Sequence, residues 1–122
     1  MFATTHLGVT MAHRRKMNPI DGCPLTAAIA ATGGKWKLLI ISWLGESPRC
    51  FGELRRLMPA AISHKVLTEQ LRELAADDIV HREAKGGVPA PVTYSLTEHG
   101  RSLVPIVAAI RGWGRTHLRR FE

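Results

Sequence analysis

Apolar residues recur at intervals of three and four from Cys23 onward, and this spacing predicts a series of helices. The first helix begins at Pro24, which suits the first turn of a helix, and stops at Gly33-Gly34. The second starts near Lys35 and ends at Gly45. Its apolar positions form one continuous stripe: Trp36, Leu39, Ile40, Trp43 and Leu44. Two amphipathic helices are therefore expected before residue 46.

A second pair of helices follows, joined by a short turn. The segment 50–59 gathers its apolar residues on one face, and Pro59 closes it. Ser63 is a favoured N-cap for the next helix, over residues 63–76, which turns three leucines inward. The outward face of that helix is polar and carries His64, Lys65, Thr68, Glu69 and Arg72.

After Asp77-Asp78 the period falls to about two, which predicts strands over residues 79–84 and 92–97. Two glycines and two prolines in residues 85–91 suit an exposed hairpin tip. A last helix is expected from about residue 98 toward residue 120, with its start kinked or delayed by Pro105. Its apolar stripe consists of Leu103, Ile106, Val107, Ile110, Trp113 and Leu118.

Two helices joined by a short turn and followed by a hairpin are typical of the winged helix-turn-helix. We therefore predict a mainly α fold with a small β-hairpin wing. The 122 residues suffice for one domain, expected over residues 21–122. Residues 1–20 show no periodicity and are interpreted as a flexible basic arm.

The net charge of the chain indicates the kind of partner that it binds. Seventeen basic residues against ten acidic ones give a net charge of +7, which favours nucleic acid first and a membrane surface second. No apolar run approaches the roughly 20 residues that span a bilayer, so the chain is expected in the cytoplasm.

The second helix of this pair, over residues 63–76, is the expected recognition helix. It is expected to enter the major groove of double-stranded DNA, because an α-helix fits there and its N-terminal side chains reach base edges. The wing would meet phosphates. The predicted DNA contacts are Ser63, His64, Lys65, Thr68, Arg72, Arg55, Arg56, Arg82 and Lys85. Two alternatives remain open: a merely solvated helix face, and a winged-helix module that binds an acidic protein.

Three blocks of the chain resemble the HxlR-type transcriptional regulators, relatives of the MarR-like proteins. They are CPLTAAIAATGGKWKLLIISWL, FGELRRLMPAAISHKVLTEQLREL and VTYSLTEHGRSLVPIVAAIRGWG. The resemblance covers about three-quarters of the chain and departs from the family where Asp77-Asp78 replaces Asp-Gly. It implies a homodimeric repressor or activator whose terminal helices form the dimer interface. The dimerisation residues would be Leu25, Ile29, Leu103, Ile106, Val107, Ile110 and Trp113.

A symmetric dimer would place two reading heads on a pseudo-palindromic operator, and a small-molecule effector or a thiol modification would change the angle between them. Cys23 stands at a helix N-terminus, where a thiolate is favoured. It is either a redox sensor, as the resemblance implies for some members, or a partly buried inert thiol. Neither a metal-ligand motif nor a nucleophile–base arrangement is visible, so we expect no cofactor, no metal and no enzymatic activity.

Overall fold

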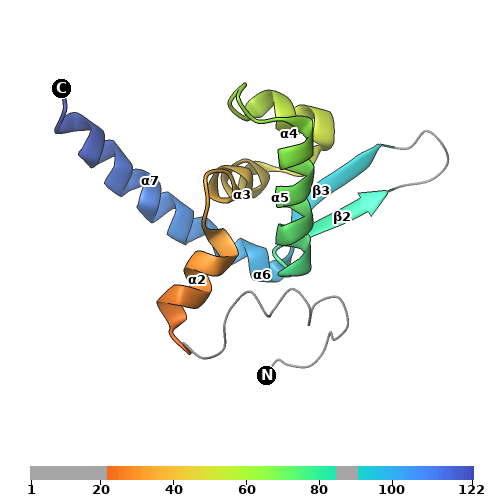
Figure 1. Cartoon of the computed structure of the whole chain (residues 1–122), viewed down its shortest axis with the longest axis horizontal. Coiled ribbons are helices and arrows are strands. Elements are labelled where there is room, and N and C mark those ends of the chain that lie inside the picture. Colours follow the sequence, from red (N-terminus) through yellow and green to blue (C-terminus); the bar gives the residue numbers. More distant parts are fainter. Residues whose placement is uncertain (1–21, 85–90) are drawn as a thin grey trace.

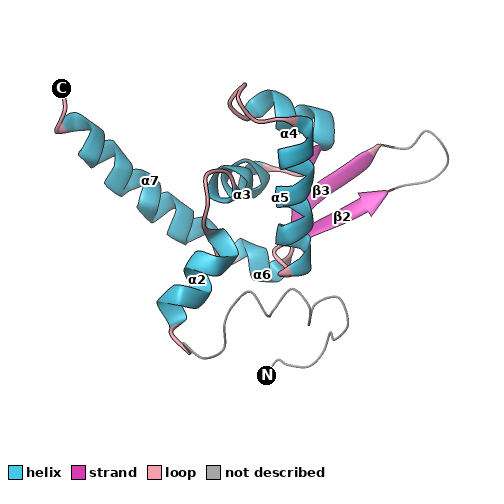
Figure 2. Ribbon diagram, in the orientation of Figure 1, coloured by secondary structure: helices cyan, strands magenta, loops and turns pink. Residues whose placement is uncertain are grey.

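A computed structural model of the chain describes residues 22–84 and 91–122. The predicted arm over residues 1–20 and the predicted wing residue Lys85 lie outside these ranges. Helices dominate the described part, and a small antiparallel sheet lies beside them (Figures 1 and 2). The elements are α2 (Pro24–Thr32), α3 (Lys37–Glu46), β1 (Arg49–Cys50), α4 (Phe51–Leu57), α5 (His64–Ala76), β2 (Val80–Ala84), β3 (Val92–Leu96), α6 (Glu98–Arg101) and α7 (Val104–Arg119). This order confirms the mainly α fold and the winged helix-turn-helix.

The core is built around α3, which packs against α4, α5, α7 and β3. Because neighbours surround this helix, its burial exceeds a single stripe. Ile41 is fully buried although the predicted stripe left it out, whereas Leu39, which the stripe included, is exposed. The sequence-based assignment was wrong at these two positions. Three leucines of α5 point inward as predicted, namely Leu67, Leu71 and Leu74.

The sheet has three strands in the order β1-β3-β2, not the two of a simple hairpin. The additional strand, β1, pairs Arg49 with Tyr94 and was not predicted, and its second residue, Cys50, had been assigned to the helical segment 50–59. On the other side of β3, Arg82 of β2 also pairs with Tyr94. The central strand therefore joins the wing to the segment that leads into α4.

The junction between α5 and β2 depends on Asp78, which takes a positive φ of 61°. Asp78 stands where the family has the glycine of Asp-Gly, and an aspartate can adopt this conformation in its place, though less readily. The hydroxyl of Thr97 donates a hydrogen bond to the carbonyl oxygen of Asp78 (2.6 Å). Gly100 packs against the same junction, since an added Cβ would overlap the carbonyl oxygen of Ile79.

The last helical segment is divided in two. The helix expected from residue 98 is interrupted near its start, as predicted for Pro105: α6 ends at Arg101, and α7 starts at Val104 with Pro105 in its first turn. Proline lacks the amide that a continuous helix would need, and it thus delays the start of the longer helix. Beyond this point α7 extends away from the body (Figure 1), and α2 has no buried residue.

Candidate nucleic-acid interface

The predicted outward face of α5 is exposed at His64, Lys65 and Arg72, whereas Thr68 and Glu69 are half-buried. The hydroxyl of Ser63 accepts a hydrogen bond from the amide of Val66 (3.1 Å), which confirms the predicted N-cap and fixes the start of the helix. His64, Lys65 and Arg72 are exposed on this face. An exposed row of two cations and a histidine can contact a polyanion without rearrangement of the fold.

The basic residues of α4 open onto the same side. Phe51 of α4 and His64 of α5 lie with their ring centroids 4.5 Å apart, which joins the two helices at their starts. A hollow of about 440 Å³ beside them is lined by Arg55 and Arg56. Both arginines are exposed. The structure therefore brings these two predicted contacts next to the start of the recognition helix.

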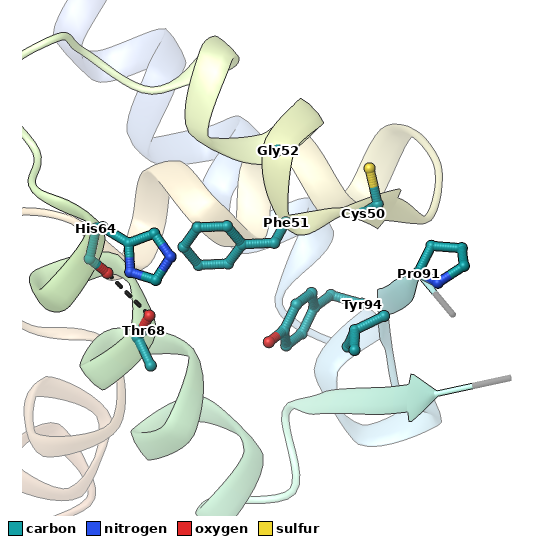
Figure 3. A pocket seen from close by; sticks show the side chains of 8 residues that line it. Cys50, Phe51, Gly52, His64, Thr68, Pro91 and Tyr94 are labelled. Carbon is teal, nitrogen blue, oxygen red and sulfur yellow. Dashed lines mark hydrogen bonds between the residues drawn. The ribbon is translucent and has the colours of Figure 1, made fainter. Parts of the chain in front are cut away.

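A groove lies between the start of α4, the first turns of α5 and the strand β3 (Figure 3). Its volume is about 460 Å³, and Phe51, His64, Thr68 and Tyr94 are among its lining residues. The hydroxyl of Thr68 donates a hydrogen bond to the carbonyl oxygen of His64 (2.8 Å), so its proton is already used within α5. Sequence reasoning missed Tyr94 because alternation along β3 indicated only an inward ring.

Arg82 completes the basic side of the site from the wing. It is exposed on β2 directly across from Tyr94. Residues directly opposite in an antiparallel pair share one face of the sheet. The structure therefore places this predicted phosphate contact on the sheet face that carries Tyr94.

A buried ion pair fixes the recognition helix to the core. Lys37 of α3 lies with its Nζ 2.7 Å from Oε1 of Glu73 on α5. The lysine side chain is 7% exposed, and Lys37 is the buried charged residue of the described chain. The sequence carried no signal for this pair, since a lysine next to Trp36 reads as a solvated residue.

The predicted dimerisation residues fall into two groups. Most of them are exposed, namely Leu25, Ile29, Ile106, Ile110 and Trp113. By contrast, Leu103 is half-buried and Val107 lies in the core of the chain, so neither offers much surface to a partner. The exposed apolar surface continues beyond the predicted set to Leu118 and Phe121. The ring of His117 stacks on the ring of Trp113, with their centroids 4.8 Å apart. His117 therefore lies between Trp113 and the apolar residues at the end of the chain.

Cys23 is exposed and is the N-cap of α2. The pKa of its thiol is lowered, first by the backbone N–H of Thr26, then by the Thr26 hydroxyl and the N–H of Leu25. These donors favour the thiolate, the form that oxidants attack. The expectation of a partly buried thiol is therefore wrong. The other thiol, Cys50, is half-buried and caps α4.

Neither a metal site nor a membrane-spanning helix is found in the part of the chain that the structure describes. Among them, no three His, Cys, Asp or Glu side chains gather to hold a metal ion. Within the same ranges, no helix has both the length and the apolar character to cross a lipid bilayer.

Comparison with known proteins identifies the class. Residues 31–122 match the family described as HxlR-like helix-turn-helix. The chain belongs to this family. The regulator YybR of Bacillus subtilis, described as an uncharacterized HTH-type transcriptional regulator, is 43% identical over 108 residues, which cover 88% of this chain and 86% of YybR. The family and its relatives make this chain an HTH-type transcriptional regulator and not an enzyme.

Solved structures agree with this assignment. The redox regulator HypR in its oxidized form aligns with a TM-score of 0.73 and 45% identity, covering 77% of this chain and 96% of HypR. The diamide-treated YodB from B. subtilis aligns with a TM-score of 0.65 and 34% identity, covering 77% of this chain and 93% of YodB. The structural neighbours of this regulator thus include redox regulators.

Proposed function

We propose that this regulator binds double-stranded DNA as a symmetric homodimer and places α5 in the major groove of each half of a pseudo-palindromic operator. The observation that carries the proposal is the outward face of α5. Its cations and His64 are exposed while its leucines fill the core, so the helix can enter a groove as it stands. The cytoplasm is the proposed place of action.

The contacts divide by position on the fold. Arg72, on the exposed crest of α5, is assigned to a base edge, and Ser63, His64, Lys65 and Thr68 stand at the helix start where base edges and phosphates are both within reach. Arg55 and Arg56 of α4, with Arg82 and Lys85 of the wing, are assigned to phosphates.

Dimerisation is supported by apolar surface that is exposed in the described part of the chain. The first and last long helices, α2 and α7, carry the large exposed apolar residues Leu25, Ile29, Ile106, Ile110 and Trp113. A surface of this kind usually marks an interface. A partner related by a two-fold axis would supply a second α5. The two helices would then bind half-sites one helical turn of DNA apart, about 34 Å.

The regulatory signal is assigned to Cys23. The thiol is exposed, and its lowered pKa favours the reactive thiolate. The structural neighbours HypR and YodB are a redox regulator and a protein solved after diamide treatment. Oxidation of Cys23 would then alter the dimer surface, on which α2 lies. A small-molecule effector bound at that surface is the alternative signal.

Titration of a fluorescent duplex tests DNA binding. The wild-type protein is expected to bind a duplex selected from a random pool, with an affinity that falls steeply as salt rises. Arg72→Ala should weaken this binding by roughly 1–3 kcal/mol, the value of a bidentate base contact. Arg119→Ala, near the end of α7, is the matched control and should bind like wild type. A wild-type protein that ignores every duplex at low salt but binds an acidic protein would instead support the protein-interaction module.

Diamide treatment tests the signal. The wild-type protein is expected to release its duplex, whereas Cys23→Ser should stay bound. Cys50→Ser removes the second thiol of the sequence and should respond like wild type. Equal release by wild type and Cys23→Ser would exclude Cys23 as the sensor.

A further inference from the structure

The hydroxyl of Tyr94 has no hydrogen-bond partner within residues 22–84 and 91–122. The residue is 8% exposed, and its ring packs within the core. The hydroxyl points into the groove between α4, α5 and β3, toward Thr68 (Figure 3). It makes no hydrogen bond to any described residue, whereas each fully buried polar side-chain atom of the described chain has a partner. The hydroxyl is therefore open to the groove, and it can donate to a ligand there.

The surroundings of the groove favour an anionic ligand. Arg82 lies directly across from Tyr94 on the same face of the sheet. Arg55 and Arg56 line the adjoining hollow, which shares Phe51 and His64 with the groove. Arg82 thus lies across the sheet from Tyr94, and Arg55 and Arg56 border the adjoining hollow, while His64 is the basic side chain that lines the groove itself.

The carboxylate of α4, Glu53, is not among the residues that line the groove. Glu53 of α4 accepts a hydrogen bond from the amide of Cys50 (2.9 Å), and this amide is the first cause of the lowered pKa of Glu53. Arg49 and Arg56 lower that pKa further. The negative charge of Glu53 is therefore already offset by an amide and two arginines.

The position of the groove beside α5 favours a phosphate of the DNA backbone as the anion. Lys65 and Arg72 lie on the exposed side of α5, which is called its crest here. His64 and Thr68 lie on the side of α5 that faces β3, where they line the groove. When a helix lies in the major groove, its crest meets base edges and its flanks meet the phosphates of the bordering strands. A strand that passes between α5 and the wing would cross this groove.

We propose that the groove seats one phosphodiester of the operator backbone and that the Tyr94 hydroxyl donates a hydrogen bond to a phosphate oxygen. The inference rests on the proposed DNA binding and assigns to Tyr94 a contact that fixes the register of the protein on the duplex. The ring of Phe51 offers an apolar surface to the adjacent deoxyribose.

Tyr94→Phe tests the seat, because it removes the hydroxyl and keeps the ring. The thermal midpoint should stay unchanged, since the structure shows no internal hydrogen bond to lose. Affinity for a 20-base-pair duplex selected by the wild type should fall about tenfold, the loss of one hydrogen bond to a charged group. The slope of log affinity against log salt concentration should not change, because a neutral hydroxyl releases no counterion from the DNA when it binds a phosphate. Arg82→Ala, the charged neighbour, should flatten that slope by about one unit.

Methylphosphonate scanning locates the phosphate. Duplexes with one neutral linkage at each backbone position are titrated against wild type and Tyr94→Phe. At one position in each half-site, the neutral linkage should weaken binding by the wild type more than binding by Tyr94→Phe, because the linkage and the variant remove the same hydrogen bond while the loss of phosphate charge affects both proteins.

Three results would overturn the seat. Tyr94→Phe could bind as tightly as wild type, the effects of linkage and variant could add at every position, or the thermal midpoint could drop by several degrees and reveal an internal partner. In each of these cases a wild type that still binds duplex in a salt-dependent manner leaves the proposed function intact. A wild type that binds no duplex overturns the proposed function and the seat together.

Discussion

Removal of the charge of Glu73 is expected to destabilise the fold more than removal of the charge of Lys37. The two groups form an ion pair of 2.7 Å, but their side chains are 32% and 7% exposed. Glu73→Gln leaves a buried ammonium facing a neutral amide, and a buried charge without its counterion costs several kcal/mol. Lys37→Met leaves a carboxylate that water can still reach. We expect losses in the free energy of unfolding of about 3 kcal/mol for Glu73→Gln and about 1 kcal/mol for Lys37→Met.

Urea unfolding followed by tryptophan fluorescence measures both losses. All variants are compared at one protein concentration, because the stability of a dimer depends on it. The double variant Lys37→Met/Glu73→Gln buries no unpaired ammonium, so it should recover about 2 kcal/mol relative to the sum of the single losses. Equal losses for the two single variants, or losses that simply add in the double variant, would refute the argument from burial.

Three shorter predictions concern other parts of the fold. Gly100→Ala should destabilise by about 1–3 kcal/mol in urea unfolding, because its Cβ would overlap a carbonyl oxygen, whereas Gly112→Ala, with open space around the added atom, should be neutral or stabilising. Ser63→Ala should cost about 1 kcal/mol by the same assay, since the cap of α5 is lost. The alkylation rate of Cys23 should rise with pH at a lower midpoint in the folded protein than in urea, because its pKa is lowered; coincident midpoints would contradict that shift.

The features that the sequence predicted correctly are those set by a few neighbouring residues. Ser63 caps α5 because its own hydroxyl meets the amide of Val66, three residues on. Asp78 turns the chain because its own φ is positive. Pro105 delays α7 because its ring removes an amide. Each of these signals survives folding, because no distant element alters it.

The errors arise where distant elements meet. A strand of two residues, β1, has no period to detect, and it exists because β3 pairs with it. Ile41 is buried because α3 has neighbours beyond one stripe. Tyr94 was correctly expected to face inward, but its hydroxyl opens into a groove that forms only when α4 and α5 pack beside β3. The exposure of Trp113 equally could not be read from a stripe, which does not distinguish a chain's own core from a partner's.

The single helix α3 holds both parts of the proposed DNA-binding surface. At its start, Lys37 binds α5 through Glu73. Past its other end, Arg49 of β1 contacts Glu46 at 3.1 Å and pairs with Tyr94 of the central strand. Because α3 contacts the recognition helix and the sheet at once, we expect these elements to move together. Arg111 of α7 donates to Ser42 of α3, so a shift of the apolar surface on α7 reaches these elements together. We therefore expect a signal at the dimer surface to change the spacing between two reading heads, while the distance between α5 and the wing within each head stays fixed.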